Sequence, residues 1–156
     1  MKITIINIAN KMPSWVEDGC NEYLKRINRG KYSCQILEIK CDKNNKRSAL
    51  ENMELEAKKI ELAIPHGSFV IALDERGKSL DSIKFAHLLE KTTLDTPQIC
   101  FIIGGADGIH PSLRAKAHLN ISLSAFVFPH ALVRVIILEQ VYRAISILEN
   151  HPYHRE

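Results

Sequence analysis

The sequence predicts an α/β fold, a mostly parallel sheet flanked by helices, in a single domain spanning residues 1–156. Three observations lead to this prediction. Runs rich in β-branched and apolar residues alternate along the chain with segments of helical periodicity, as in βαβ units. Two of these runs, 68–73 and 99–103, are apolar without interruption, as expected of strands buried on both faces. The length of 156 residues corresponds to one domain.

The first half of the chain contains two strand–helix pairs. In order, the expected elements are a strand at 3–8, a helix at 14–27, a strand at 32–39, a polar lysine-rich loop at 42–47 and a helix at 50–64. Pro13 stands where proline is favoured, at the start of a helix. Apolar side chains then recur at helical spacing through both helical segments. Pro65, His66 and Gly67 end the second helix.

The second half continues the alternation. Its expected elements are a strand at 68–73, a turn at 74–78, a helix at 82–91, a strand at 99–103, a short helix after Pro111, a strand at 120–123, a long helix at 131–150 and the tail 151–156. Pro97 precedes the strand at 99–103, and Gly104 and Gly105 end that strand. No internal repeat or linker interrupts the pattern.

The composition excludes several classes of protein. With 46% hydrophobic and 25% charged residues, the chain matches a globular protein and not a disordered or disulfide-stapled one. No apolar run approaches the roughly 20 residues of a membrane span, so no membrane partner is expected. The net charge of +3 is too small for a DNA-coating protein, so no DNA partner is expected. A basic stretch at 25–47 could follow phosphates, although a solvated surface is favoured.

The four cysteines indicate neither a disulfide framework nor a metal centre. Cys20, Cys34, Cys41 and Cys100 form no CxxC pair and no zinc spacing. Cys34 and Cys100 lie in strand-like runs, where a free buried thiol is usual. The N-terminal run is too short for a signal peptide. Reduced thiols and the absence of an export signal predict a cytoplasmic protein.

Three loops are candidates for a binding site, because ligands of parallel sheets bind beyond the carboxyl ends of the strands. They are 73–75, 104–108 and 122–130. The second has the spacing G-G-x-x-G and matches neither the dinucleotide fingerprint nor a P-loop. Its adjacent glycines permit close backbone approach to a ligand, and a plain tight turn is an equal alternative. The third is apolar where a polar turn is expected, so a ligand, a partner or a chain crossing should cover it, unless it simply extends a core strand.

The last helix and the tail are unusual. The helix at 131–150 has almost no polar face, and a terminal helix of this kind can be buried against a second copy in a two-fold interface. Within it, Glu139 and Arg143 have the i, i+4 spacing of a structural ion pair. In the tail, Tyr153 suits base stacking and Arg155 suits phosphate contact. The alternative is an expendable terminus, and no metal site is expected because Pro152 breaks the spacing of the tail histidines.

Five segments together carry a resemblance to a known family. They are NKMPSWVEDGCNEYLKR (10–26), IIGGADGI (102–109), SLSAFVFPHALVR (122–134), EQVYRA (139–144) and NHPYHRE (150–156). The combination resembles the ribosomal RNA large subunit methyltransferase H family, which belongs to the SPOUT class of knotted S-adenosylmethionine-dependent enzymes. The glycine loop departs from the family in Ala106 and Asp107, where Pro-Glu is commoner.

The resemblance implies a fold, a cofactor and a substrate. The C-terminal half would form a trefoil knot, and the working unit would be a homodimer. S-adenosylmethionine would contact the nine residues Leu73, Gly104, Gly105, Leu123, Ser124, Ala125, Phe126, Val127 and Phe128. The methyl group would go to N3 of a pseudouridine in the intersubunit stem-loop of 23S ribosomal RNA, in assembled ribosomes.

The chemistry of such a reaction suggests roles for the remaining polar residues. Because N3 of a uracil-type ring carries a proton, it becomes nucleophilic only when that proton leaves. His130, beside the apolar loop, is the candidate for handling the proton or orienting the base. Arg134, Tyr153, His154 and Arg155 would hold the nucleotide, the tail completing the partner's site. Two alternatives are a non-catalytic ribosome-associated RNA-binding module and an α/β enzyme of another class; the absence of a G-x-S-x-G elbow counts against the second.

Overall fold

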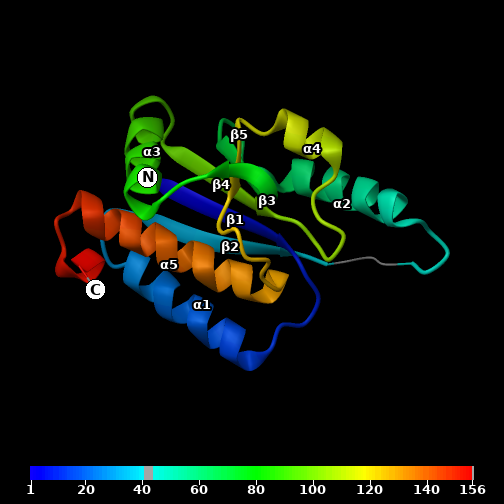
Figure 1. Ribbon diagram of the computed structural model, residues 1–156, viewed down its shortest axis with the longest axis horizontal. Helices are drawn as coiled ribbons and strands as arrows, with labels where there is room; N and C mark the ends of the chain where they lie inside the picture. Colours follow the sequence, from blue (N-terminus) through cyan, green and yellow to red (C-terminus); the bar gives the residue numbers. More distant parts are fainter. Residues whose placement is uncertain (41–43, 156) are drawn as a thin grey trace.

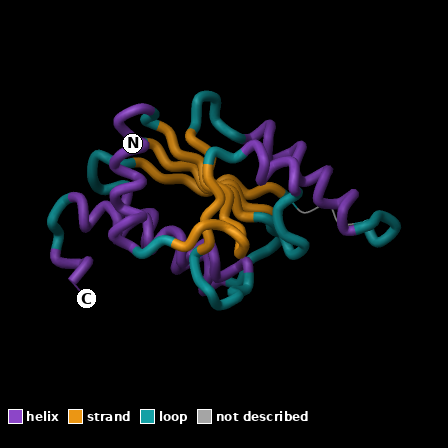
Figure 2. The backbone as a smooth tube through the Cα atoms, turned by 45° about the horizontal axis from the view of Figure 1, so that its top comes forward, coloured by secondary structure: helices purple, strands orange, loops and turns teal. Residues whose placement is uncertain are grey.

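The computed structural model describes residues 1–40 and 44–155. Within them, five parallel strands form one sheet in the order β2-β1-β4-β3-β5, and Figure 2 shows this sheet at the centre of the molecule. The strands are β1 (Lys2–Ile8), β2 (Ser33–Ile39), β3 (Phe69–Ser79), β4 (Gln98–Ile103) and β5 (Leu119–Ser122). The predicted α/β fold with a parallel sheet is therefore confirmed.

Helices cover both faces of the sheet, which explains why the strands are apolar without interruption. The helices α1 (Ser14–Ile27), α3 (Ser82–Asp95) and α5 (His130–Leu148) pack on one face. The helices α2 (Ala49–Ala63) and α4 (Pro111–Lys116) pack on the other. A short 3₁₀ helix, η1 (Pro152–Arg155), follows α5. In Figure 1, α1 and α5 lie side by side below the sheet.

The alternation of side chains along β1 divides the core into two parts. Ile3 and Ile5 belong to the cluster under α1, α3 and α5, whereas Ile6 and Ile8 belong to the cluster under α2 and α4. This is the two-residue period of a strand. Asn7, on the same face as Ile3 and Ile5, is fully buried, and both atoms of its amide lack a hydrogen-bond partner among the described residues.

Local sequence accounts for the helix boundaries. The expected helix at 14–27 is confirmed without change. The second helix begins at Ala49, because the hydroxyl of Ser48 accepts a hydrogen bond of 3.2 Å from the Glu51 amide. In return, the Glu51 carboxylate accepts one of 2.7 Å from the Ser48 amide. This reciprocal capping box satisfies two amides that the helix leaves unpaired. The loop expected at 42–47 begins with two residues that lie outside the described part of the chain.

The turn expected at 74–78 is wrong, since β3 continues to Ser79. The strand pairs with β4 as far as Leu73 and then follows β5. Ile121 of β5 is the register partner of both Leu73 and Lys78, so the intervening residues form a bulge. At its end a Cβ on Gly77 would lie only 2.6 Å from the Ile121 backbone. Glycine is therefore required where the two chain segments meet.

Candidate active site

A cavity of about 460 Å³ opens at the carboxyl ends of β3 and β4. Its walls come from the end of β3, the glycine loop and the start of α5, and they are formed by Leu73, Asp74, Glu75, Arg76, residues 103–109, Phe128, Pro129, His130 and Val133. A neighbouring cavity of about 140 Å³ shares part of this wall and extends along residues 122–128. The three loops singled out in the sequence thus meet at one edge of the sheet, as the topology predicts.

The glycine loop combines a tight turn with an absence of side chains. The Gly108 amide donates a hydrogen bond of 3.0 Å to the Gly105 carbonyl, and Gly108 has a positive φ of 88°. A Cβ on Gly104 would lie 2.6 Å from the backbone of Gly108, and one on Gly105 would lie 3.3 Å from the Glu56 carboxylate. A side chain on Gly104 would therefore collide with the backbone of its own turn, and one on Gly105 would be crowded against Glu56, so the turn can be this tight because both residues are glycine.

The apolar loop exposes its largest side chains. Phe126 is 81% exposed and Val127 is 82% exposed. Two serines fix the loop, because the Ser122 hydroxyl donates 3.0 Å to the Ser124 carbonyl and the Ser124 hydroxyl accepts 2.9 Å from the Phe126 amide. The loop is thus ordered by hydrogen bonds, and its apolar side chains remain available to a ligand or a partner chain.

The structure brings eight of the nine expected cofactor contacts to the walls of the two cavities. Leu73, Gly104, Gly105 and Phe128 line the larger cavity, while Leu73 again, Leu123, Ser124, Phe126, Val127 and Phe128 line the smaller one. Ala125 is exposed between the two groups. These residues come from three loops far apart in the sequence, and they lie together because their strands are parallel.

His130 and Arg134 lie one turn apart on α5 but occupy different environments. His130, the first residue of the helix, is exposed and lines the larger cavity. Arg134 is only 2% exposed and forms an ion pair of 2.7 Å with Glu38 of β2. Its Nε and Nη2 have no hydrogen-bond partner within the described chain. The structure therefore places His130 in the cavity wall and Arg134 in the interior, paired with β2 and outside the lining of both cavities.

The other three candidate residues lie at the far end of the same helix. Tyr153, His154 and Arg155 belong to η1, which follows the end of α5 (Figure 1). The 19 residues of α5 span about 28 Å at 1.5 Å per residue. Within one chain these side chains are therefore not brought together with His130.

The tail is anchored to its own chain through Tyr153. The Tyr153 hydroxyl donates a hydrogen bond of 3.1 Å to Oε1 of Glu139 and lies 3.3 Å from the Tyr23 hydroxyl. Its ring packs edge-on against Tyr142 at 4.7 Å between centroids. Burial raises the pKa of Tyr153, and the Tyr23 hydrogen bond and the Glu139 charge raise it further. The predicted pair of Glu139 and Arg143 is confirmed, with Nη2 at 2.7 Å from Oε1.

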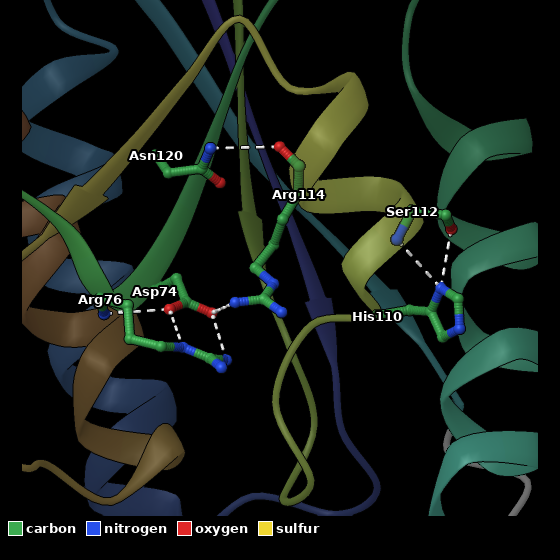
Figure 3. A network of polar contacts seen from close by, with 6 residues as sticks. All are labelled: Asp74, Arg76, His110, Ser112, Arg114 and Asn120. Atoms are coloured by element: carbon green, nitrogen blue, oxygen red, sulfur yellow. Dashed lines mark hydrogen bonds and ion pairs between the residues drawn. The ribbon is translucent and has the colours of Figure 1, made fainter.

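Sequence reasoning missed a charged network at the cavity wall, shown in Figure 3. Asp74 accepts hydrogen bonds from the Arg76 amide and from the Arg76 guanidinium, with Nε at 3.0 Å and Nη2 at 3.3 Å. Arg114 of α4 approaches the same carboxylate at 3.7 Å. Burial by itself would raise the pKa of Asp74, but the hydrogen bonds and charges of Arg76 and Arg114 lower it overall. The sequence feature that could have revealed this network is the Asp-x-Arg spacing of Asp74 and Arg76 at the end of an apolar run.

The cysteines are buried thiols where the structure describes them. Cys20, Cys34 and Cys100 are free and buried, and burial raises the pKa of both Cys34 and Cys100 to about 12. Cys41 lies outside the described residues. In the described ranges, no three His, Cys, Asp or Glu side chains gather into a group that could hold a metal ion. No helix there is long and apolar enough to cross a membrane.

A parallel sheet with a cavity at the carboxyl ends of its strands, beside a glycine loop and an apolar loop, places the protein in the class of open α/β folds that bind ligands at this edge. The family model described as "Predicted SPOUT methyltransferase" matches residues 1–154, and the chain belongs to the SPOUT methyltransferase family. It is 46% identical over 156 residues to the Ribosomal RNA large subunit methyltransferase H of Ralstonia pickettii, covering 99% of each chain. It is 43% identical over 157 residues to the protein of the same name from Neisseria gonorrhoeae, covering 100% of each.

A solved structure supports the fold. The probable methylase family protein of Haemophilus influenzae Rd KW20 superimposes with a TM-score of 0.56 at 14% identity, over 97% of this chain and 69% of that one. At this level of identity the likeness concerns the fold alone.

Proposed function

We propose that this protein transfers a methyl group from S-adenosylmethionine to N3 of a pseudouridine in the intersubunit stem-loop of 23S ribosomal RNA, in assembled ribosomes. The relatives are named ribosomal RNA large subunit methyltransferase H, which supports a ribosomal RNA substrate. The observation that carries the proposal is the meeting of the glycine loop, the apolar loop and His130 around one cavity. Such an enzyme works in the cytoplasm, where its substrate is.

The residues present fit S-adenosylmethionine. The apolar loop and Leu73 offer an apolar surface for an adenine ring. Backbone groups of residues 123–128 other than the Ser124 carbonyl and the Phe126 amide, which the two serines engage, could form hydrogen bonds with the edge of that ring. Gly104 and Gly105 line the larger cavity and carry no side chains, so a ligand could approach their backbone closely. When bound, the cofactor supplies an activated methyl group, so the protein's main task is to align it with the nucleophile.

His130 is the proposed proton-handling group. His130 lines the cavity at the start of α5. A neutral imidazole can accept the N3 proton or hydrogen-bond the base as the proton leaves. Arg134, which is buried and paired with Glu38, would act by stabilising the first turns of α5.

In a homodimer, the start of α5 in one protomer could lie next to the tail that follows α5 in the partner. Leu132, Val133, Val135 and Ile136 remain half-exposed on the isolated chain, so α5 retains an apolar surface for a second copy. A two-fold axis across the middle of α5 would bring the partner's tail to the cavity, about 28 Å from where the chain's own tail lies. His154 and Arg155 would then hold the nucleotide in the partner's site, while Tyr153 fixes the direction of the tail.

We further propose that the chain works as one domain whose C-terminal half is knotted. The single five-stranded sheet that joins all the described strands supports one domain. The knot is inferred from membership of the SPOUT family, because knots are nearly absent among other proteins.

Two measurements test the proposed function. Calorimetry with S-adenosylhomocysteine should show binding, and the alternative of a non-catalytic ribosome-associated RNA-binding module predicts none. Methyl transfer to assembled ribosomes and to free 23S RNA, mapped by mass spectrometry, should yield N3-methylpseudouridine in the assembled particles. A product at another atom would refute the proposed substrate.

A further inference from the structure

The larger cavity has a marked charge pattern on its wall. Asp74, Glu75 and Asp107 place carboxyl groups there, and Arg76 is the one Lys or Arg among the described residues that line it. The methionine part of S-adenosylmethionine ends in an α-carboxylate and an α-ammonium group. A buried or partly buried carboxylate needs a cationic or hydrogen-bonding partner, and Arg76 is the cation within this cavity wall.

The bulge in β3 sets the position of Arg76. Asp74 accepts hydrogen bonds from two of the five N–H donors of the Arg76 guanidinium, one on Nε and one on Nη2. The Arg76 side chain is nevertheless 63% exposed, whereas that of Asp74 is 6% exposed. The Asp74 carboxylate thus holds the Arg76 guanidinium along one edge (Figure 3), and the other N–H donors remain for a ligand in the cavity that Arg76 lines. Arg114 approaches Asp74 from α4 at 3.7 Å and adds positive charge behind the pair.

We propose that Arg76 binds the α-carboxylate of the cofactor's methionine part, with Asp74 as its positioning residue. The proposal rests on the proposed function, because it assumes S-adenosylmethionine as the ligand. It assigns the cofactor's two ends to the two cavities: adenine lies along the apolar loop, and the amino-acid end reaches the charged wall. A guanidinium suits this role because its planar donors can form charge-assisted hydrogen bonds to a carboxylate.

Two ligands that differ only at the amino-acid end test the assignment. Titration calorimetry should compare S-adenosylhomocysteine with 5′-methylthioadenosine, which lacks the carboxylate and the ammonium group. Arg76→Ala should weaken binding of the first about tenfold, as expected from the loss of a charged hydrogen bond, and that of the second less than about twofold. Arg76→Lys should lie between. Arg29→Ala, an exposed arginine outside both cavities, is the matched control and should change neither affinity.

Each outcome is decisive. Equal weakening of both ligands would show that Arg76 only maintains the loop, and unchanged affinities would show that it does not reach the ligand; either result overturns the inference. If the unsubstituted protein binds 5′-methylthioadenosine and S-adenosylhomocysteine equally well, the charged wall contributes nothing and the inference also fails. Absence of binding of both ligands overturns the proposed function, and the inference with it.

Discussion

Tyr153 and Glu139, 14 residues apart, are joined by a hydrogen bond of 3.1 Å that fastens the end of the chain to the last helix. The Glu139 oxygen that accepts this bond also holds Arg143 at 2.7 Å. A segment of this composition would be frayed if nothing fixed it. Here the Glu139 carboxylate binds both Arg143 on the helix and Tyr153 in the tail.

Tyr153→Phe should loosen the tail. The substitution keeps the ring contact with Tyr142 but removes the hydrogen bond to Glu139, which is worth about 0.5–1.5 kcal/mol. Hydrogen exchange followed by mass spectrometry should show faster exchange in residues 151–155. Tyr32→Phe, whose ring lies beside Lys31 and away from Glu139, is the control. Unchanged exchange in Tyr153→Phe would mean that ring packing alone holds the tail.

Gly77→Ala should destabilise the fold. A Cβ at this position would lie 2.6 Å from the backbone of Ile121, so β3 and β5 would have to separate, at a cost of about 1–3 kcal/mol or more. Urea unfolding should show a lower midpoint, and S-adenosylhomocysteine should bind more weakly. Gly30→Ala, with nothing within 4 Å of its Cβ, should leave the midpoint nearly unchanged. Equal midpoints for the two variants would contradict the close approach.

Asn7→Leu should stabilise the protein. Asn7 is fully buried, and neither atom of its amide has a hydrogen-bond partner in the described ranges. Leucine has a similar shape and avoids the desolvation cost of about 1–3 kcal/mol. Thermal unfolding should show a rise of several degrees. Thr4→Val is the control, because the Thr4 hydroxyl accepts from Gln35 at 3.5 Å, and it should not stabilise. A lower melting temperature for Asn7→Leu would reveal a partner for the amide.

Leu132→Glu should dissociate the proposed dimer. The residue is half-exposed on α5, at the surface assigned to the second copy, where a buried charge without a partner is unfavourable. Light scattering after size exclusion should give a mass near 17.7 kDa for this variant and about twice that for the unsubstituted chain. Leu62→Glu, 89% exposed on α2, is the same change on the opposite face and should leave the mass unchanged. A dimer in both variants would place the interface elsewhere.

The ion pair of Asp74 and Arg76 should contribute to stability in a pH-dependent manner. The pKa of Asp74 is lowered from its ordinary 3.8 in the folded chain, so its ionised form is favoured by folding. The contribution is therefore complete above about pH 4 and is lost as the pH falls through the lowered pKa. The difference in unfolding free energy between the unsubstituted protein and Asp74→Asn should be constant from pH 7 to pH 5 and shrink below pH 4. A difference independent of pH would show that the carboxylate is not stabilised by its charge.

The sequence was sufficient for those elements whose structure is decided locally. The helix Ser14–Ile27 has its proline and its apolar spacing within one segment. The capping box of Ser48 and Glu51 fixes the next helix in the same local way. The parallel sheet could be predicted from the alternation of strand-like and helical segments along the chain. The position of the cavity then followed from the sheet, because loops after parallel strands share one edge.

What could not be predicted depends on partners distant in the sequence. Residues 74–78 are polar and contain Gly77, which indicates a turn, and only β5 makes them part of a strand. Arg134 is an arginine among the apolar residues of the first half of α5, and its burial depends on Glu38, 96 positions away. His130 and the tail are separated because α5 is one unbroken helix. The sequence predicted this long helix, but only the three-dimensional arrangement shows that its two ends cannot meet in one chain.

The length of α5 has a genetic consequence. In the proposed dimer, each site takes His130 from one gene product and the tail from the other. A chain altered at His130 and a chain altered at Arg155 would each form inactive homodimers. Coexpressed, they would form a mixed dimer in which both defects fall on one site and the other site is intact. Two non-functional alleles would thus complement each other.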